Sequence, residues 1–142
     1  MPILSKTWTS QINASGYRLT TPRRVISEII FASDRSLTPT EIFIEARNRC
    51  KGIGLVTVYR TLEHLDGLGL VERVHHEGDC HSYIARQNDH QHLLICRNCH
   101  RVIYFNGDDF SILMKTISET SGFQIQDHWF QLLGICPNCQ KK

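Results

Sequence analysis

The apolar residues in the first half of the chain follow helical spacing. They predict one helix beginning near Thr21-Pro22, a second beginning with a capping box at Thr38-Pro39, and a third over about 56–65. Residues 70–74 and 82–84 have the composition of two strands that are joined by a turn. Three helices followed by a hairpin are the element order of a winged helix-turn-helix domain.

The second half of the chain predicts a smaller unit of mixed structure. Residues 92–96 and 102–105 are apolar enough for two strands, the spacing over 110–117 favours one helix, and 123–133 is expected to form a last strand. The polar stretch 86–89 is the expected hinge. We therefore expect an α+β protein with a winged-helix domain over residues 1–86 and a small α/β domain over residues 87–142.

Four cysteines form two C-x-x-C pairs, Cys96 with Cys99 and Cys136 with Cys139, and 36 residues separate the pairs. Two such pairs are what a tetrahedral zinc site requires, because each pair presents two thiolates to one ion at about 2.3 Å. Four thiolates leave no open coordination position, so this pattern predicts a structural zinc ion. Buried or disulfide-bonded cysteines are the alternative, and a reducing compartment disfavours disulfides.

The composition bounds the class of protein. The chain has 142 residues, of which 41% are apolar, and a formal net charge of +2, which by itself does not indicate nucleic-acid binding. Residues 1–60 nevertheless carry nine Lys/Arg against four Asp/Glu, and all eight histidines lie from His64 onward. No apolar run approaches the roughly 18 residues of a membrane span, and the start lacks a secretory signal. We expect a cytoplasmic protein with no membrane partner and no small-molecule substrate.

The basic first half suggests contact with double-stranded DNA. A winged helix lays its third helix in the major groove, and the outward side of that helix would offer Thr57, Tyr59, Arg60 and Thr61 to the DNA. Phosphates would be met by basic residues before and around this helix, namely Arg18, Arg23, Arg24, Lys51 and Arg73. For any one of these side chains, a solvated surface position is the alternative.

Histidines near the expected hinge suggest a second metal site. His90 and His92 would point the same way from a strand, and His128 is expected on a neighbouring strand. In the expected hairpin, Cys80 and His81 are further ligand types, and a thiolate would favour zinc over iron. The alternatives are surface or hydrogen-bonded histidines and a lone thiol on a turn.

Three motifs that are each weak alone form a specific set. They are Gly16-Tyr-Arg-Leu-Thr-Thr-Pro-Arg-Arg24, Val56-Thr-Val-Tyr-Arg-Thr-Leu62 followed by Gly69-Leu-Val71, and the two cysteine pairs. In this order they resemble the ferric uptake regulator (Fur) family over nearly the whole chain. The resemblance implies a metal-dependent repressor with an amino-terminal winged helix and a carboxy-terminal dimerisation domain, which binds a palindromic operator as a homodimer.

The resemblance also implies ligands for a regulatory divalent ion, Zn²⁺ or Fe²⁺, in the dimerisation domain. His90, His92 and His128 match family ligands, and the family's acidic ligand falls at Ser111, so Asp109 is the expected substitute. The family's interdomain site is missing in its usual form, because its helix histidine falls near Ser36 and its hairpin acid near Ile84. Cys80 and His81 are the expected ligands of a differently built site.

The expected function is therefore a zinc-sensing (Zur-like) repressor of metal-homeostasis genes. An iron- or peroxide-sensing regulator of the same family is the alternative. A zinc-dependent deaminase or other hydrolase is a remote alternative, because His75-His76-Glu77 matches H-x-E but Ile95 stands where such enzymes need Pro before C-x-x-C. A zinc-ribbon module that binds protein would not need the basic first half.

Overall fold

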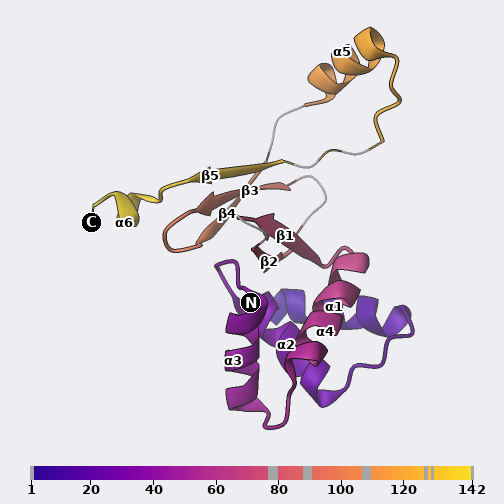
Figure 1. Ribbon diagram of the computed structural model, residues 1–142. Helices are drawn as coiled ribbons and strands as arrows, with labels where there is room; N and C mark the ends of the chain where they lie inside the picture. The colour runs from indigo at the N-terminus through magenta and orange to yellow at the C-terminus, as the bar shows by residue number, and fades with distance from the viewer. Residues whose placement is uncertain are drawn as a thin grey trace. The chain divides into compact units, whose positions relative to one another are not determined.

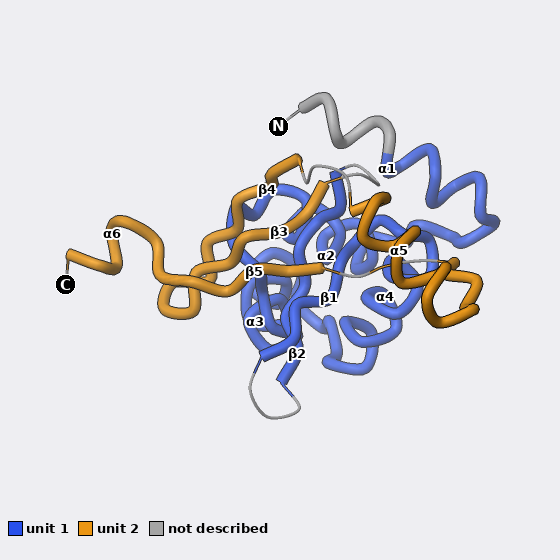
Figure 2. Tube along the Cα trace, turned by 90° about the horizontal axis from the view of Figure 1, so that it is seen from above, with its two compact units in different colours: residues 1–87 blue, residues 88–142 orange. Residues whose placement is uncertain are grey.

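The computed structural model describes residues 2–76, 80–87, 91–106, 110–126, 128 and 130–141, with side chains from Trp8 onward. The chain divides into two compact units, residues 1–87 and residues 88–142, which Figure 2 shows in different colours. We call them unit 1 and unit 2 and describe each by itself. Among the described residues, no helix is both long and apolar enough to cross a membrane.

Unit 1 contains helices followed by a two-stranded hairpin (Figure 1). In chain order the elements are α1 (Pro2–Ala14), α2 (Thr21–Ala32), α3 (Pro39–Arg49), α4 (Leu55–Gly67), β1 (Val71–His75) and β2 (His81–Ala85). This order confirms the predicted winged helix-turn-helix domain, with α4 as its third predicted helix. Helix α1, which precedes the three expected helices, was not predicted from the sequence.

The helix starts follow from local side-chain chemistry. Proline occupies the first turn of both α2 and α3, where its missing N–H removes no helical hydrogen bond. At α3 the Glu41 backbone N–H donates to the Thr38 hydroxyl at 3.2 Å, and the Thr38 backbone N–H donates to the Glu41 carboxylate at 2.7 Å. The predicted capping box is confirmed.

The core of unit 1 lies between these helices. Its fully buried side chains come from α1, α2, α3 and α4 and include Ile12, Ile26, Ile30, Ile42, Val58, Leu62 and Leu65. Helix α1 closes the core on one side, because Trp8 is buried and stacks on Phe31 with ring centroids 4.9 Å apart. Burying the inner face of α4 leaves its opposite face exposed to solvent.

Unit 2 is a three-stranded sheet with two helical segments. Its elements are β3 (Gln91–Cys96), β4 (Val102–Asn106), α5 (Ser111–Ser121), β5 (Gln131–Gly134) and α6 (Pro137–Gln140). Strand β3 lies in the middle, antiparallel to β4 and parallel to β5. The two units together give the predicted α+β class.

The expected last strand is much shorter than the sequence indicated. We predicted a strand over 123–133, but of the residues described in that stretch and just beyond it, only Gln131–Gly134 pair with β3. A parallel neighbour needs a crossover connection, and the residues after α5 supply the return path to the start of β3. The helix predicted over 110–117 is confirmed as α5, and it ends at Gly122, whose φ of 77° lies in the left-handed region.

Helix α5 has an apolar face that nothing in the described chain buries. Ile112 is 73% exposed, Leu113 55% and Ile117 44%, and no residue of the helix is buried. The core of unit 2 is correspondingly small, with Leu93 and Ile95 of β3 as its fully buried side chains. A unit of this size with so few buried side chains requires additional cross-linking or a partner to be stable.

Candidate metal centre and nucleic-acid interface

The four predicted zinc ligands lie together at one end of the unit 2 sheet. Cys96 is the last residue of β3, and Cys99 lies in the tight turn that follows. Cys136 is the N-cap of α6, just beyond β5, and Cys139 lies within that helix. Because β3 and β5 are parallel, with Cys96 opposite Gly134, both cysteine pairs follow the carboxyl ends of neighbouring strands.

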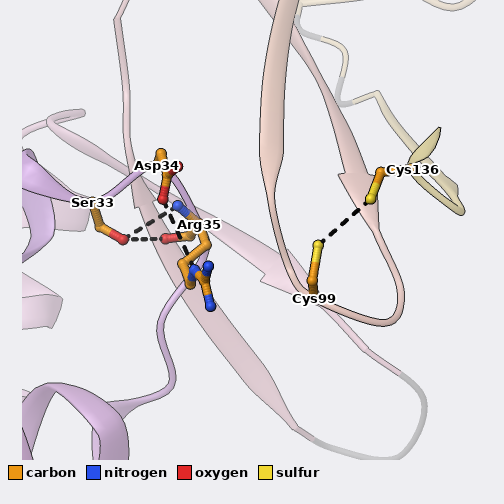
Figure 3. Close-up of polar contacts among 5 residues, drawn as sticks. All are labelled: Ser33, Asp34, Arg35, Cys99 and Cys136. Carbon is orange, nitrogen blue, oxygen red and sulfur yellow. Dashed lines mark hydrogen bonds and ion pairs between the residues drawn. The ribbon is translucent and has the colours of Figure 1, made fainter. Parts of the chain in front are cut away.

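The sulfur geometry fits a tetrahedral ion. The four sulfur atoms all lie within 4.8 Å of one another, and no other set of three or more such donors is found among the described residues. The Cys99 and Cys136 sulfurs are 3.8 Å apart (Figure 3). Ligands at about 2.3 Å from a tetrahedral centre lie about 3.8 Å from each other, so the cluster has the dimensions of a zinc tetrathiolate.

Backbone amides of the two turns also stabilise thiolates. The Cys99 N–H lowers the pKa of Cys96 to about 6, and the Cys139 N–H lowers the pKa of Cys136. The Cys136 backbone N–H also donates to the Cys96 sulfur at 3.3 Å. The hydrogen bond with Cys136 raises the pKa of Cys139 to about 12. Four thiolates therefore need a cation to replace the last proton, and a divalent ion of the zinc type supplies that charge.

The first turn contains an unusual residue at its end. His100 has a φ of 63°, in the left-handed region that favours glycine. Its backbone N–H donates to the Cys96 carbonyl at 3.0 Å and closes the turn, while the Cys96 N–H donates to Arg101 at 2.9 Å. His100 therefore closes the turn through its backbone.

Two of the predicted regulatory ligands lie side by side in unit 2. His92 of β3 is only 8% exposed, and its ring centroid is 5.5 Å from that of His128. Three phenylalanines surround the His92 ring at centroid distances of 5.4–5.7 Å, namely Phe105, Phe110 and Phe130. His92 is therefore enclosed by aromatic rings beside a second imidazole, and imidazole nitrogens are common metal ligands.

The other two residues of unit 2 predicted to bind the regulatory ion lie in parts of the chain that the structure does not describe. His90 and Asp109 lie outside the described residues. The expectation that His128 belongs to the last strand is wrong, because β5 begins only at Gln131. His128 instead reaches His92 from the connection that leads into β5, where its side chain is exposed.

The hairpin ligands have a different arrangement from the expected one. Cys80 is exposed and directly precedes β2, and His81 is the first residue of that strand. His81 lies opposite His75 in the β1–β2 pairing, and the two rings meet edge to face with centroids 4.7 Å apart. This pairing was not predicted from the sequence, although a hairpin centred on residue 78 would have placed residues 75 and 81 opposite each other.

Helix α4 presents the predicted DNA-reading side chains unevenly. Tyr59 and Arg60 are exposed on its outer face, whereas Val58 and Thr61 are buried in the core. The expected exposure of Thr61 is wrong, because its side chain turns back to the Thr57 carbonyl on the inner side of the helix. Thr57 is half-buried, and its carbonyl accepts a hydrogen bond from the Thr61 hydroxyl at 2.7 Å. Of the predicted DNA-contacting side chains on α4, the Tyr59 ring and the Arg60 guanidinium are therefore the most accessible to DNA.

The predicted phosphate contacts include one residue with a structural role. Arg18 and Lys51 are exposed, but Arg23 donates from its guanidinium to the Arg18 carbonyl at 2.7 Å and lies 4.1 Å from the centroid of the Tyr17 ring. The other face of that ring stacks on His64 of α4, with centroids 3.6 Å apart. Burial, followed by the charge of Arg23, lowers the pKa of His64. This stack, which was not predicted, joins the segment before α2 to α4.

Comparison with known proteins identifies the family that this chain resembles over most of its length. The model of the ferric uptake regulator family matches residues 14–133. The ferric uptake regulation protein of Legionella pneumophila is 31% identical over 131 residues, which cover 92% of this chain and 96% of that protein. The crystal structure of the Vibrio cholerae ferric uptake regulator is 29% identical with a TM-score of 0.67, over 88% of this chain and 96% of that one.

A zinc uptake regulator solved with zinc and DNA has the same fold, with a TM-score of 0.77 at 20% identity over 99% of this chain and 94% of that one. The chain belongs to the ferric uptake regulator family, whose members are metal-responsive transcriptional regulators that bind DNA and are not enzymes.

Proposed function

We propose that this chain is a zinc-sensing transcriptional repressor that acts in the cytoplasm as a homodimer on a palindromic operator near metal-homeostasis genes. The observation that carries the proposal is that unit 2 contains two chemically different groups of side chains that could bind a metal ion. One set consists of four clustered cysteines, and the other includes the His92–His128 pair. A regulator of this kind needs one ion that stays bound and another that exchanges with the cell.

The tetrathiolate is suited to the permanent role. Its four sulfurs complete the coordination of zinc, and the two pairs join the ends of β3 and β5. Removal of this ion would open the sheet. We therefore assign it a structural role and do not expect it to exchange at the zinc concentrations that a sensor follows.

The histidine pair is suited to the exchanging role. We assign His92 and His128 as ligands of the regulatory ion, and His90 and Asp109 as the ligands that complete its coordination. The centroid separation of 5.5 Å between the two rings is close to the roughly 5 Å that two imidazoles on one tetrahedral ion require when each nitrogen lies about 2.0–2.1 Å from the metal. Imidazole ligands suit zinc and iron alike. The exposed thiol of Cys80, next to His81 at the start of β2, supports zinc as the sensed ion.

The proposed output is DNA binding through α4. Tyr59 and Arg60 would contact base edges, and Arg18 and Lys51 would contact phosphates, since all four side chains are exposed. A homodimer would place its two α4 helices in successive major grooves about 34 Å apart. Without the regulatory ion only a fraction of molecules would hold that spacing, and the apparent affinity for the operator would fall by that fraction.

The experiment begins with metal analysis of the dimer purified without added metal. A mild chelator then removes exchangeable ions and leaves the tetrathiolate, and binding to DNA from upstream of the protein's own gene is measured as Zn²⁺, Fe²⁺ or Mn²⁺ is returned. The proposal predicts about one retained zinc per chain and recovery of binding at the lowest concentration with Zn²⁺. Recovery with Fe²⁺ at a lower concentration than Zn²⁺ would identify an iron sensor. If the affinity for DNA is the same with and without each ion, DNA binding is not switched by metal.

Two histidine variants make this experiment specific. His128→Gln removes one imidazole of the His92–His128 pair. The zinc midpoint, which is the Zn²⁺ concentration that gives half-maximal DNA binding, should therefore rise at least tenfold. His100→Gln changes a histidine that closes the first cysteine turn through its backbone, and that midpoint should stay within about twofold of wild type. Equal effects of the two variants would show that the His92–His128 pair is not the sensing site.

A further inference from the structure

We propose that the hairpin of unit 1 carries a metal site of its own, formed by His75 and His81, which binds a divalent transition ion of the imidazole-preferring class, with Zn²⁺ as the physiological occupant. This site uses neither the four cysteines nor the His92–His128 pocket. It does not depend on the proposed function, because all of its ligands lie in β1 and β2.

The strand pairing brings the two imidazoles together. His75 and His81 are direct partners in the antiparallel register. The His76 backbone N–H donates to the Cys80 carbonyl at 3.1 Å, which makes the next pair toward the turn a hydrogen-bonded pair. Since pair types alternate along an antiparallel ladder, His75 and His81 form a non-hydrogen-bonded pair, in which opposite side chains are closest.

The observed separation of the rings is close to the separation that one ion requires. Their centroids are 4.7 Å apart and the ring planes are inclined at 87°. Two imidazoles on one tetrahedral zinc ion, each with nitrogen about 2.0–2.1 Å from the metal, have centroids about 5 Å apart. A small rotation of the side chains would therefore accommodate the ion without a change in the backbone.

One ring nitrogen at this position lacks a partner. The Nδ1 atom of His81 is buried and has no hydrogen-bond partner among the described residues. A buried nitrogen without a partner costs free energy, and coordination of an ion would satisfy its lone pair. His75 is exposed, so an ion can reach the pair from solvent.

The neighbouring side chains define the extent of the site. The ring of His76 is hydrogen-bonded to the Ser82 hydroxyl, with Nε2 and Oγ 2.6 Å apart, so His76 is not counted as a ligand. The guanidinium of Arg73 would repel a cation, but it lies 3.5 Å from the Asp66 carboxylate, which offsets its charge. The site is therefore bidentate, with water as the remaining ligands, and should bind zinc more weakly than the tetrathiolate.

The test is a Zn²⁺ titration of the full-length protein with its structural zinc in place and its histidines labelled with ¹⁵N. The ring-nitrogen resonances of His75 and His81 should shift together with one midpoint. In the His75→Gln variant the midpoint at His81 should rise at least tenfold, because one ligand of the chelate is lost. His76→Gln, a change at the adjacent histidine, is the matched control and should leave the midpoint within about twofold.

Three results would overturn the proposal: separate midpoints for His75 and His81, an unchanged midpoint at His81 in His75→Gln, or an equal effect of His76→Gln. The resonances of His92 and His128 report the regulatory pocket in the same sample. A failure of the hairpin site can therefore be distinguished from a failure of the proposed zinc sensing. A folded hairpin in each variant is verified in uniformly ¹⁵N-labelled protein by the amide resonances of Val74 and Tyr83, which belong to the two strands.

Discussion

Replacement of one zinc ligand should unfold unit 2 while unit 1 stays folded. Cys139→Ser removes the thiolate contributed by α6 and leaves three sulfurs. The hydroxyl of serine is a poor zinc ligand at neutral pH, so the ion should be lost or held much more weakly. The connection between the two cysteine pairs then becomes an open chain.

The size of the effect follows from the loop that the ion closes. Cys99 and Cys136 are 37 residues apart in the chain, and the entropy of closing a cross-linked loop of that length corresponds to about 4 kcal/mol at 25 °C. A unit of about 55 residues has a total free energy of unfolding of about 3–8 kcal/mol by its length alone. Because few of its side chains are buried, loss of the ion should remove most of that margin.

The assay combines zinc content with amide hydrogen exchange resolved by segment. In Cys139→Ser, zinc should fall to well below one ion per chain, and the amides of β3 should exchange much faster, whereas α2 and α4 should keep their protection. Cys50→Ala is the matched control, because Cys50 is a half-buried cysteine at the end of α3 and lies outside the cluster. It should retain full zinc content and wild-type protection of β3.

Either of two results would refute this reasoning. A variant that loses its zinc but keeps wild-type protection across β3 would show that the sheet does not depend on the ion. A variant that keeps one zinc per chain at unchanged affinity would show that Cys139 is not a ligand.

Three further predictions concern unit 1. Thr38→Ala removes the capping box of α3 and should lower the urea-derived free energy of unfolding by about 1 kcal/mol, whereas Thr40→Ala should change it little. The pKa of His64 lies below 6.5, so neutral His64 contributes stability that is complete above pH 6.5 and is lost as the pH falls through its lowered pKa. His64→Gln should accordingly flatten the decline of the urea midpoint between about pH 7 and pH 5. Arg60→Ala should weaken operator binding by about 1–3 kcal/mol in a gel shift and leave zinc content unchanged.

The parts of the structure that were predictable have local causes. The capping box at Thr38, the stop at Gly122 and the spacing within each cysteine pair depend on residues a few positions apart, so the sequence alone indicates them. The exposed position of Arg60 and the burial of Leu62 follow from helical periodicity in the same way.

The parts that were missed depend on contacts between distant segments. The extent of β5 is set by where the returning chain meets β3, and nothing in residues 123–133 marks that point. The hydrogen bond and ring contact of Arg23 require the fold of the segment around Tyr17, so a basic residue that looked like a phosphate ligand also has a structural role. The pairing of His75 with His81 became visible only in the register of β1 and β2.

The distance along the chain between the two cysteine pairs has a consequence for biosynthesis. A ribosome adding about 5–20 residues per second would take about 2–7 s to make the 37 residues from Cys99 to Cys136. During that interval the first two thiols leave the ribosome without their partners, while β3 still lacks its parallel neighbour β5. The nascent carboxy-terminal half is then open to oxidation and misassembly, and its maturation should be sensitive to the supply of zinc at the moment of translation.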